Sequence, residues 1–307
     1  MNYEQENPLP MAEPAAPQEP VPLIPYGWLR ALLFLIVYVF LSVGIASAIA
    51  IFSGGRVQLG KELDSPQEMA VQAVLLGVLL LQTWFFRRVV DRRSFMSLGF
   101  SIDKTIARHM FHGALWGIGL MTVPFLVFLT YGYLTVTDAV FHPGSLITLF
   151  FTLLFAAAIE EILCRGYLLR NLMNSMNRYV ALAVVSLLFA LMHGGNANLS
   201  WVGMLNIFFA GILLGIYYIH RRNLWFPISL HLFWNFFQGG IYGIPVSGTT
   251  PPGVLQSVVS GDELITGGAF GFEASLPVLI MLAAVIVVLE LVYRTKTEDK
   301  QPIQPIR

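Results

Sequence analysis

The sequence predicts an all-α polytopic membrane protein with about eight transmembrane helices and both termini in the cytoplasm. Of its 307 residues, 56% are hydrophobic and only 12% are charged. Soluble domains carry about 25% charged residues, so this composition indicates a protein embedded in a lipid bilayer. The net charge is zero, without the basic surplus that is typical of nucleic-acid binding. We therefore expect no nucleic-acid partner.

Residues 1–26 are polar, acidic and rich in proline. This segment offers too little apolar surface to offset the entropy of an ordered chain, so it is predicted to be a disordered tail. It also differs from a secretory signal, which starts with positive charge and runs directly into a short apolar core.

A spanning helix needs roughly 20 mainly apolar residues, and the chain offers eight candidates near 28–52, 69–86, 110–134, 146–169, 179–194, 201–219, 225–243 and 276–294. The fifth candidate is short, and the glycines at the end of the seventh leave its boundary undefined. We divide the membrane part into three N-terminal helices (27–144), a core of four helices (145–243), a Gly/Pro-rich non-cytoplasmic loop (244–275), and a last helix with a basic tail (276–307).

Lysine and arginine are concentrated in alternate connections, which sets the predicted orientation. They follow the second, fourth, sixth and eighth helices, at Arg87, Arg88, Arg92, Arg93, Lys104, Arg108, Arg170, Arg178, Arg221, Arg222, Arg294, Lys296, Lys300 and Arg307. The other connections carry only Arg56 and Lys61. Because cytoplasmic loops carry the excess of Lys and Arg, this distribution places both termini in the cytoplasm.

Three acidic residues fall well inside the predicted spans: Glu160, Glu161 and Glu290. Glu290 lies about one turn from a helix end, so its side chain can extend to the interface. Glu160 and Glu161, in "AAAIEEILCRG", lie deep in the fourth helix, where a charge is costly. Arg165 is four residues after Glu161 and shares its face, which favours an ion pair. Glu160 points elsewhere, free to meet another helix.

Two histidines are candidate partners for this carboxylate. His193 closes the apolar run "VVSLLFALMH", and His231 precedes Asn235 by one turn in "HLFWN". A desolvated carboxylate can act as a general base toward water, and a histidine beside it can hold that water or share the proton. An imidazole with an asparagine amide can stabilise the resulting oxyanion. The alternative is a charge cluster that only locks helices together.

The motifs EExxxR ("EEILCR"), FxxxH ("FALMH") and HxxxN ("HLFWN") follow one another on predicted spans. With the stretch "NIFFAGILLGIYYIHRRNLWFPISLHLFWNF" they resemble the CPBP family of CAAX-protease and bacteriocin-processing intramembrane endopeptidases, related to the type II CAAX prenyl endopeptidase. The resemblance covers about residues 145–240, and "LITGGAFGFEASL" adds a bacterial feature.

The resemblance implies that Glu160 and His193 activate the water and that His231 and Asn235 form the oxyanion hole. Glu161 and Arg165 would then be supporting residues, in agreement with their helical spacing. Helix depth conflicts with this arrangement, because His193 follows Arg178 by fifteen residues and would lie toward the outer face while Glu160 is deeper. Gly211, Gly215 and Asn206 are expected to serve helix packing.

Two other mechanisms and one other class of protein stay open at this stage. Two histidines and one glutamate can form a catalytic zinc site, although no HExxH motif is present and we favour no cofactor. Cys164 shares a face with Glu160, but a neighbouring carboxylate disfavours the thiolate that a nucleophile needs. A non-catalytic immunity factor, scaffold or transporter would also tolerate buried charges.

We therefore predict a multi-pass intramembrane endopeptidase of the bacterial inner (cytoplasmic) membrane, of the glutamate type. Its substrate would be a peptide or a membrane-anchored protein, cut near the anchor, in a chamber that opens to the cytoplasm. The sequence specifies neither the substrate nor the oligomeric state.

Overall fold

The computed structural model describes residues 20–54, 60 and 62–298. The predicted tail lies mostly outside this range, as do Arg56, Lys61 and the end of the basic C-terminal tail. Each of the eight predicted apolar segments forms a helix: α1 (Gly27–Phe52), α2 (Pro66–Phe85), α3 (Ile106–Thr130), α4 (Pro143–Glu161), α6 (Arg178–Met192), α7 (Trp201–Arg221), α8 (Trp225–Asn235) and α10 (Leu276–Glu298).

Three of these helices continue as π-helical stretches. The extensions are Phe86–Val90 after α2, Ile162–Leu169 after α4 and Phe236–Ile241 after α8. The one after α4 leads directly into the short α5 (Arg170–Leu172), so 143–172 is one continuous helical rod. π-Helical turns are frequent at functional sites, and two of these three stretches directly follow Glu161 and Asn235.

Six helical segments of the described chain are long and apolar enough to cross a membrane. The other two are shorter, since α6 has 15 residues and α8 has 11. The predicted helical multi-pass architecture is therefore confirmed, whereas the count of eight full-length spans is not. The shortness of α6 has consequences for the site described below.

The otherwise helical structure also contains a small two-stranded sheet, which was not predicted. Strands β1 (Leu134–Ala139) and β2 (Leu255–Val259) pair antiparallel, from Leu134 opposite Val259 to Ala139 opposite Leu255. The third helix stops at Thr130, and Gly132 turns the chain with a positive φ of 77°. The sequence "LTVTDA" that follows contains three consecutive β-branched residues, a composition that favours an extended strand.

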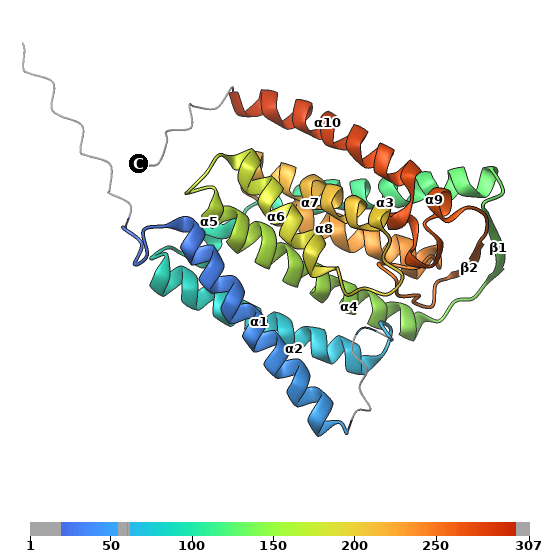
Figure 1. The fold of residues 1–307 in the computed structure, drawn as a ribbon, viewed down its shortest axis with the longest axis horizontal. Coiled ribbons are helices and arrows are strands. Elements are labelled where there is room, and N and C mark those ends of the chain that lie inside the picture. The colour runs from blue at the N-terminus through green and yellow to red at the C-terminus, as the bar shows by residue number, and fades with distance from the viewer. Residues whose placement is uncertain (1–19, 55–59, 61, 299–307) are drawn as a thin grey trace, which may run out of the picture.

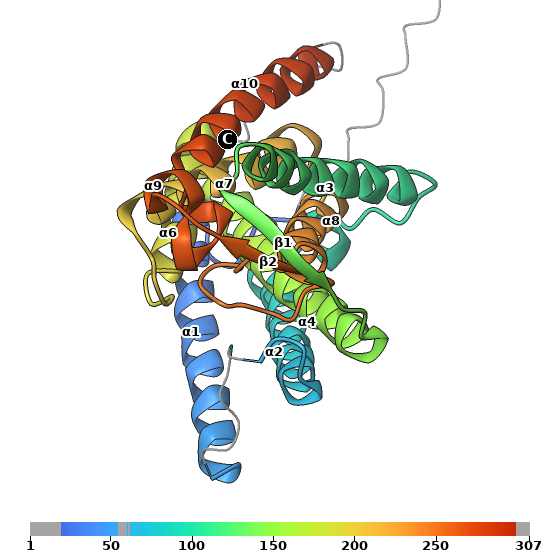
Figure 2. The same cartoon turned by 90° about the vertical axis from the view of Figure 1, so that its right-hand side faces the viewer.

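The helices form an elongated bundle in which α7 is central and α1 and α10 lie at the periphery (Figure 1). The small sheet crosses one end of this bundle (Figure 2). The loop between the π-helical stretch after α8 and α10 also folds against this end, through α9 (Glu263–Thr266) and two short 3-10 turns, Gly268–Phe270 and Phe272–Ala274. We call this the sheet end.

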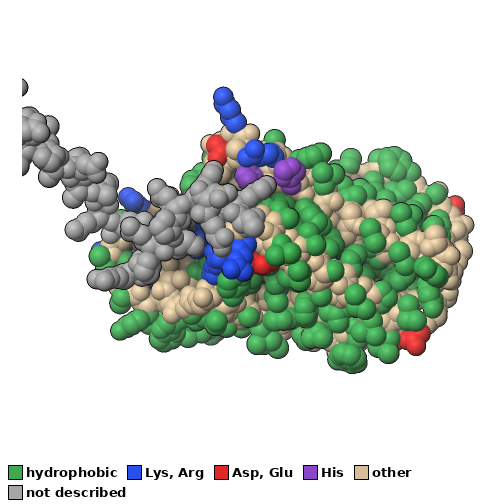
Figure 3. All heavy atoms as spheres, turned by 90° about the horizontal axis from the view of Figure 1, so that it is seen from above, with side chains coloured by type: hydrophobic (Ala, Val, Ile, Leu, Met, Phe, Trp, Pro, Cys, Tyr) green, Lys and Arg blue, Asp and Glu red, His purple; other side chains and the backbone are tan. Residues whose placement is uncertain are grey.

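The opposite end carries the positive charge, and we call it the basic end. It contains the starts of α1, α3, α6 and α8 and the ends of α2, α5, α7 and α10, with Arg87, Arg88, Arg92, Arg93, Lys104, Arg108, Arg170, Arg178, Arg221, Arg222 and Arg294. In Figure 3 the Lys and Arg side chains lie in the left and central part of the visible face, with some acidic side chains among them, whereas the right-hand end shows acidic side chains without Lys or Arg.

Helices α3 and α8 pack closely, because two glycines of α3 face α8. A Cβ at Gly113 would overlap the carbonyl oxygen of Phe226, and one at Gly117 would overlap that of Leu230. Small residues allow such close approach between membrane helices. The contact fixes α8, and with it His231 and Asn235, relative to the rest of the bundle.

Gly117→Ala is expected to lower the stability of the protein by about 1–3 kcal/mol, the usual cost of overpacking a well-packed interface. Gly119→Ala is the matched control on the same helix, because a Cβ there meets nothing within 4 Å. Thermal unfolding of the purified protein in detergent measures both. Equal melting temperatures for the two variants would contradict the close packing described here.

Candidate active site

The predicted site residues meet around a cavity of about 830 Å³. Glu160, His193, His231 and Asn235 line it, although they come from α4, the turn after α6, and α8. Glu161 and Arg165 lie behind it and are fully buried. The structure thus brings together four side chains that the sequence separates by up to 75 residues.

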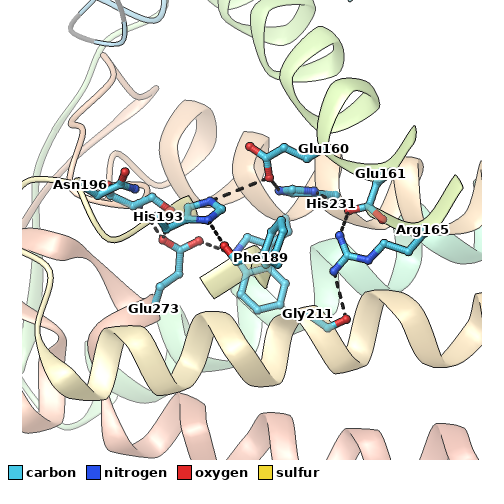
Figure 4. A network of polar contacts seen from close by, with 11 residues as sticks. Glu160, Glu161, Arg165, Phe189, His193, Asn196, Gly211, His231 and Glu273 are labelled. Atoms are coloured by element: carbon cyan, nitrogen blue, oxygen red, sulfur yellow. Dashed lines mark hydrogen bonds and ion pairs between the residues drawn. The ribbon is translucent and has the colours of Figure 1, made fainter. Parts of the chain in front are cut away.

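Glu160 is the meeting point of the two histidines (Figure 4). Its Oε2 atom lies 3.9 Å from Nε2 of His193 and 3.8 Å from Nε2 of His231. These distances are within ion-pair range but too long for direct hydrogen bonds. Within the described residues, Oε2 is a buried atom without a hydrogen-bond partner. Such an unsatisfied buried carboxylate oxygen is unusual and marks a candidate catalytic group.

His193 is held in one orientation by the helix that precedes it. Its Nδ1 atom lies 2.8 Å from the carbonyl oxygen of Phe189, four residues earlier. A carbonyl oxygen only accepts, so Nδ1 is the donor, and in the neutral ring Nε2 carries a lone pair. That lone pair is on the side of Glu160.

The ion pair that the EExxxR spacing predicts is present. Nη1 of Arg165 donates to Oε1 of Glu161 at 2.7 Å, and Nη2 donates to the carbonyl oxygen of Gly211 at 3.0 Å. The guanidinium also lies over the ring of Phe189, 4.6 Å from its centroid. Arg165 therefore connects α4 to both α6 and α7 next to the cavity.

Glu161 has a second partner that the sequence did not indicate. Its Oε1 also lies 3.0 Å from Nδ1 of His231. A carboxylate only accepts, so His231 donates through Nδ1 and turns Nε2 toward Glu160 and the cavity. The supporting pair thus orients one of the candidate catalytic residues directly, rather than only neutralising a charge.

The conflict over helix depth is resolved by the shortness of α6. From Arg178, its 15 residues extend about 22 Å at a rise of about 1.5 Å per residue. Glu160 precedes Leu172 on the α4–α5 rod, so by the same rise it lies about 18 Å from the basic end. His193 and Glu160 are therefore at a similar depth. Helix α6 stops inside the bundle instead of reaching the sheet end.

Sequence reasoning missed Glu273, which also lines the cavity. Its Oε2 accepts from the backbone nitrogen of Ser247 at 2.6 Å and from its hydroxyl at 2.9 Å, while Oε1 accepts from Nε1 of Trp234 at 3.1 Å. Burial raises the pKa of this carboxyl above its ordinary value, and the bonds from Ser247 offset part of the shift. It was missed because the search for buried charge was confined to the predicted spans.

Glu273 fixes the chain beside the candidate catalytic cluster. Ser247, which it holds, accepts a hydrogen bond on its carbonyl oxygen from Asn196 at 3.1 Å, three residues after His193. The signal for this role was the short stretch "GFEASL", in which a glutamate follows glycines in an otherwise apolar sequence.

We expect Glu273→Leu to destabilise the protein by about 1–3 kcal/mol for each buried donor that it leaves unpaired. Glu263→Leu, at an exposed position of the neighbouring α9, is the control and should change stability by no more than about 0.5 kcal/mol. Thermal unfolding compares the two. A melting temperature for Glu273→Leu that matches the Glu263→Leu value would show that these hydrogen bonds do not anchor the loop.

Other residues singled out in the sequence have structural positions. Asn206 lines the cavity and donates to the carbonyl oxygen of Ser275 at 2.9 Å, and a Cβ at Gly211 would crowd Ser186, so both take part in packing. Cys164 is completely buried. Glu290 accepts hydrogen bonds at the basic end from Tyr179 at 2.6 Å and pairs with His220 at 2.8 Å, away from the cavity.

Comparison with known proteins gives one family match. Residues 142–237 match the family model described as Type II CAAX prenyl endopeptidase Rce1-like, which confirms the resemblance to the CAAX proteases. The matched region includes Glu160, Glu161, Arg165, His193, His231 and Asn235. It ends before Glu273. No curated protein and no solved structure matched the chain.

Proposed function

We propose that this protein is a glutamate-type intramembrane endopeptidase that hydrolyses a peptide bond near a membrane anchor without a metal ion. The family match supports a CAAX-type intramembrane protease in general. The observation that carries the finer proposal is the approach of Glu160 Oε2 to the Nε2 atoms of two histidines, at 3.9 and 3.8 Å, at a cavity wall.

Glu160 and His193 would activate the water. A water molecule between them would donate one proton to the carboxylate and the other toward Nε2 of His193, since both groups present acceptors. Removal of a proton by Glu160 then leaves a nucleophile directed at the scissile carbonyl carbon. The proton on Glu160 would pass to the leaving amine as the tetrahedral intermediate collapses.

His231 and Asn235 would stabilise the oxyanion. Because Nδ1 of His231 already donates to Glu161, Nε2 can donate to an oxyanion only when the ring carries both protons. The carboxylates of Glu160 and Glu161 on either side favour that positive charge electrostatically. The Asn235 side chain, one turn further along α8, supplies an amide donor on the same wall of the cavity.

The zinc alternative uses the same Glu160, His193 and His231. Among the residues that the structure describes, no group of three or more His, Cys, Asp or Glu side chains is arranged to hold a metal ion. We propose the metal-independent mechanism on the ground that no HExxH motif is present and that the three ligands would come from three separate helical segments. Cleavage by the purified protein is expected to persist in the presence of a strong chelator, whereas loss of cleavage that zinc restores would favour the metal site.

The test of the function compares peptide termini in membranes from cells that express the wild type or Glu160→Ala at equal protein levels. New termini that occur only with the wild type are expected, and they would identify the substrate. Identical sets of termini would refute the protease function. They would favour a charge cluster that only locks helices together, or a non-catalytic scaffold.

A further inference from the structure

The charge of the molecule differs between its two ends. The basic end carries the arginines and lysines of the connections after α2, α5 and α7. The sheet end has no Lys or Arg among its described residues and carries acidic ones, namely Glu62, Asp64, Glu68, Asp138, Asp262, Glu263 and Glu273. Membrane proteins retain Lys and Arg on the cytoplasmic side. The basic end is therefore the cytoplasmic one.

The rim of the catalytic cavity lies at the other end. Its exposed lining residues are Met192 at the end of α6, Gly60, Gly195 and Ala197 in the connections after α1 and α6, and Thr250 in the loop before β2. None of the described lining residues comes from the connections after α2, α5 or α7. The mouth of the cavity is thus surrounded by loops of the sheet end.

The path from the cavity to the basic end is closed by packed side chains. On the rod that continues α4, Cys164 and Tyr167 are completely buried, and on α8 so are Phe226 and Leu230. Tyr218, near the basic end of α7, is also completely buried. Toward the sheet end, by contrast, α6 stops at Met192, so this helix does not continue past the cavity on that side. Of the two ends, the described residues therefore leave the sheet end as the one from which a peptide reaches Glu160.

The lining also restricts the charge of a substrate. Glu160 and Glu273 are acidic, and the described lining contains no Lys or Arg. A substrate whose free C-terminal carboxylate lay next to the scissile bond would meet two carboxylate side chains and no cationic partner other than a protonated histidine. A neutral or basic internal segment meets no such repulsion.

We propose that the catalytic cavity opens to the non-cytoplasmic face of the membrane and that its substrate is a neutral or basic internal segment of a membrane-anchored protein on that face. The substrate part of this proposal rests on the proposed protease function. The orientation of the mouth rests on the positions of the rim and of the charges alone. It reverses the cytoplasmic opening expected from the sequence.

The orientation is tested by thiol labelling, which needs no catalytic activity. In a Cys164→Ala background, single cysteines are introduced at the rim, as Ala197→Cys or Thr250→Cys, and at the basic end, as Lys104→Cys. All three positions are exposed. A membrane-impermeant maleimide is added to intact spheroplasts and, separately, to lysed ones. The rim cysteines should react in both samples, and the cysteine at position 104 only after lysis. The reverse pattern would overturn the orientation.

A second arm tests the route to the site and the substrate. Labelling the Ala197→Cys variant with a bulky maleimide should abolish cleavage, whereas the same label at position 104 should leave it unchanged. The wild-type-dependent peptide termini should map to non-cytoplasmic, internal segments of membrane-anchored proteins. Termini in cytoplasmic segments would overturn the substrate assignment. If no such termini exist, the protease function fails, while the labelling result still decides which way the cavity faces.

Discussion

Replacing Glu160 with Gln is expected to lower the rate of peptide hydrolysis by roughly 10²–10⁴-fold, the usual contribution of a general base. The amide is close to isosteric with the carboxylate but cannot take the proton of water at neutral pH. The side chain is 28% exposed at the cavity and its Oε2 makes no hydrogen bond within the described residues. Its neutralisation should therefore leave the fold intact.

The measurement is the rate of product formation by purified wild type and variant with the substrate that the comparison of peptide termini supplies. Thermal unfolding of the same preparations is the control, and the two melting temperatures should agree. The effect should fall on kcat, because the role proposed for Glu160 is to activate water rather than to bind substrate. A variant that folds normally and cleaves at more than about a tenth of the wild-type rate would exclude Glu160 as the general base.

His193→Gln distinguishes the two residues of the proposed water-activating pair. Glutamine can accept a hydrogen bond from water but is not tethered to the Phe189 carbonyl oxygen in the way that the imidazole is. If His193 only positions the water, this variant should retain more activity than Glu160→Gln. Equal losses in the two variants would instead indicate that both residues take part in proton transfer.

The sequence predicts the parts of this site that depend on local spacing. Hydropathy locates the helices because every backbone polar group must be satisfied inside the bilayer. The four-residue interval between Glu161 and Arg165 predicts their ion pair because side chains four apart share a helical face. Both predictions use only short stretches of chain.

Contacts between distant segments were not predictable from spacing. The bond between Glu161 and His231 joins α4 to α8 across 70 residues, and nothing in either motif specifies it. The role of Glu273 depends on a loop that folds back to meet Ser247 and Trp234. The strands β1 and β2 are 115 residues apart or more at every pair, so neither signals its partner.

Helix α6 shows how a correct local prediction gave a wrong expectation. The apolar run before His193 was recognised as short, yet it was treated as a full span, which placed His193 too far from Glu160. The structure ends α6 at Met192 within the bundle, and tertiary packing of the following turn, including the bond from Asn196 to Ser247, stabilises that position.

The largest loss of stability is expected for Arg165→Leu, about 3–5 kcal/mol, the cost of leaving one member of a buried ion pair unpaired. Both Arg165 and Glu161 have essentially no exposed surface. Thermal or denaturant unfolding in detergent measures the change. The control is the double variant Glu161→Leu/Arg165→Leu, in which no buried charge is left without a partner, and which should recover part of the lost stability.

Activity in this double variant separates a supporting role from a purely structural lock. Glu161 accepts the bond that orients His231, so a variant without Glu161 should fold and still cleave slowly, with the loss in kcat rather than in KM. A lock that only joins α4 to α6 and α7 predicts the opposite, namely that activity returns with stability. Recovery of both stability and activity would mean that contacts other than the one with Glu161 orient His231. Recovery of stability alone would show that the pair is part of the catalytic arrangement and explain why this membrane helix carries two adjacent glutamates.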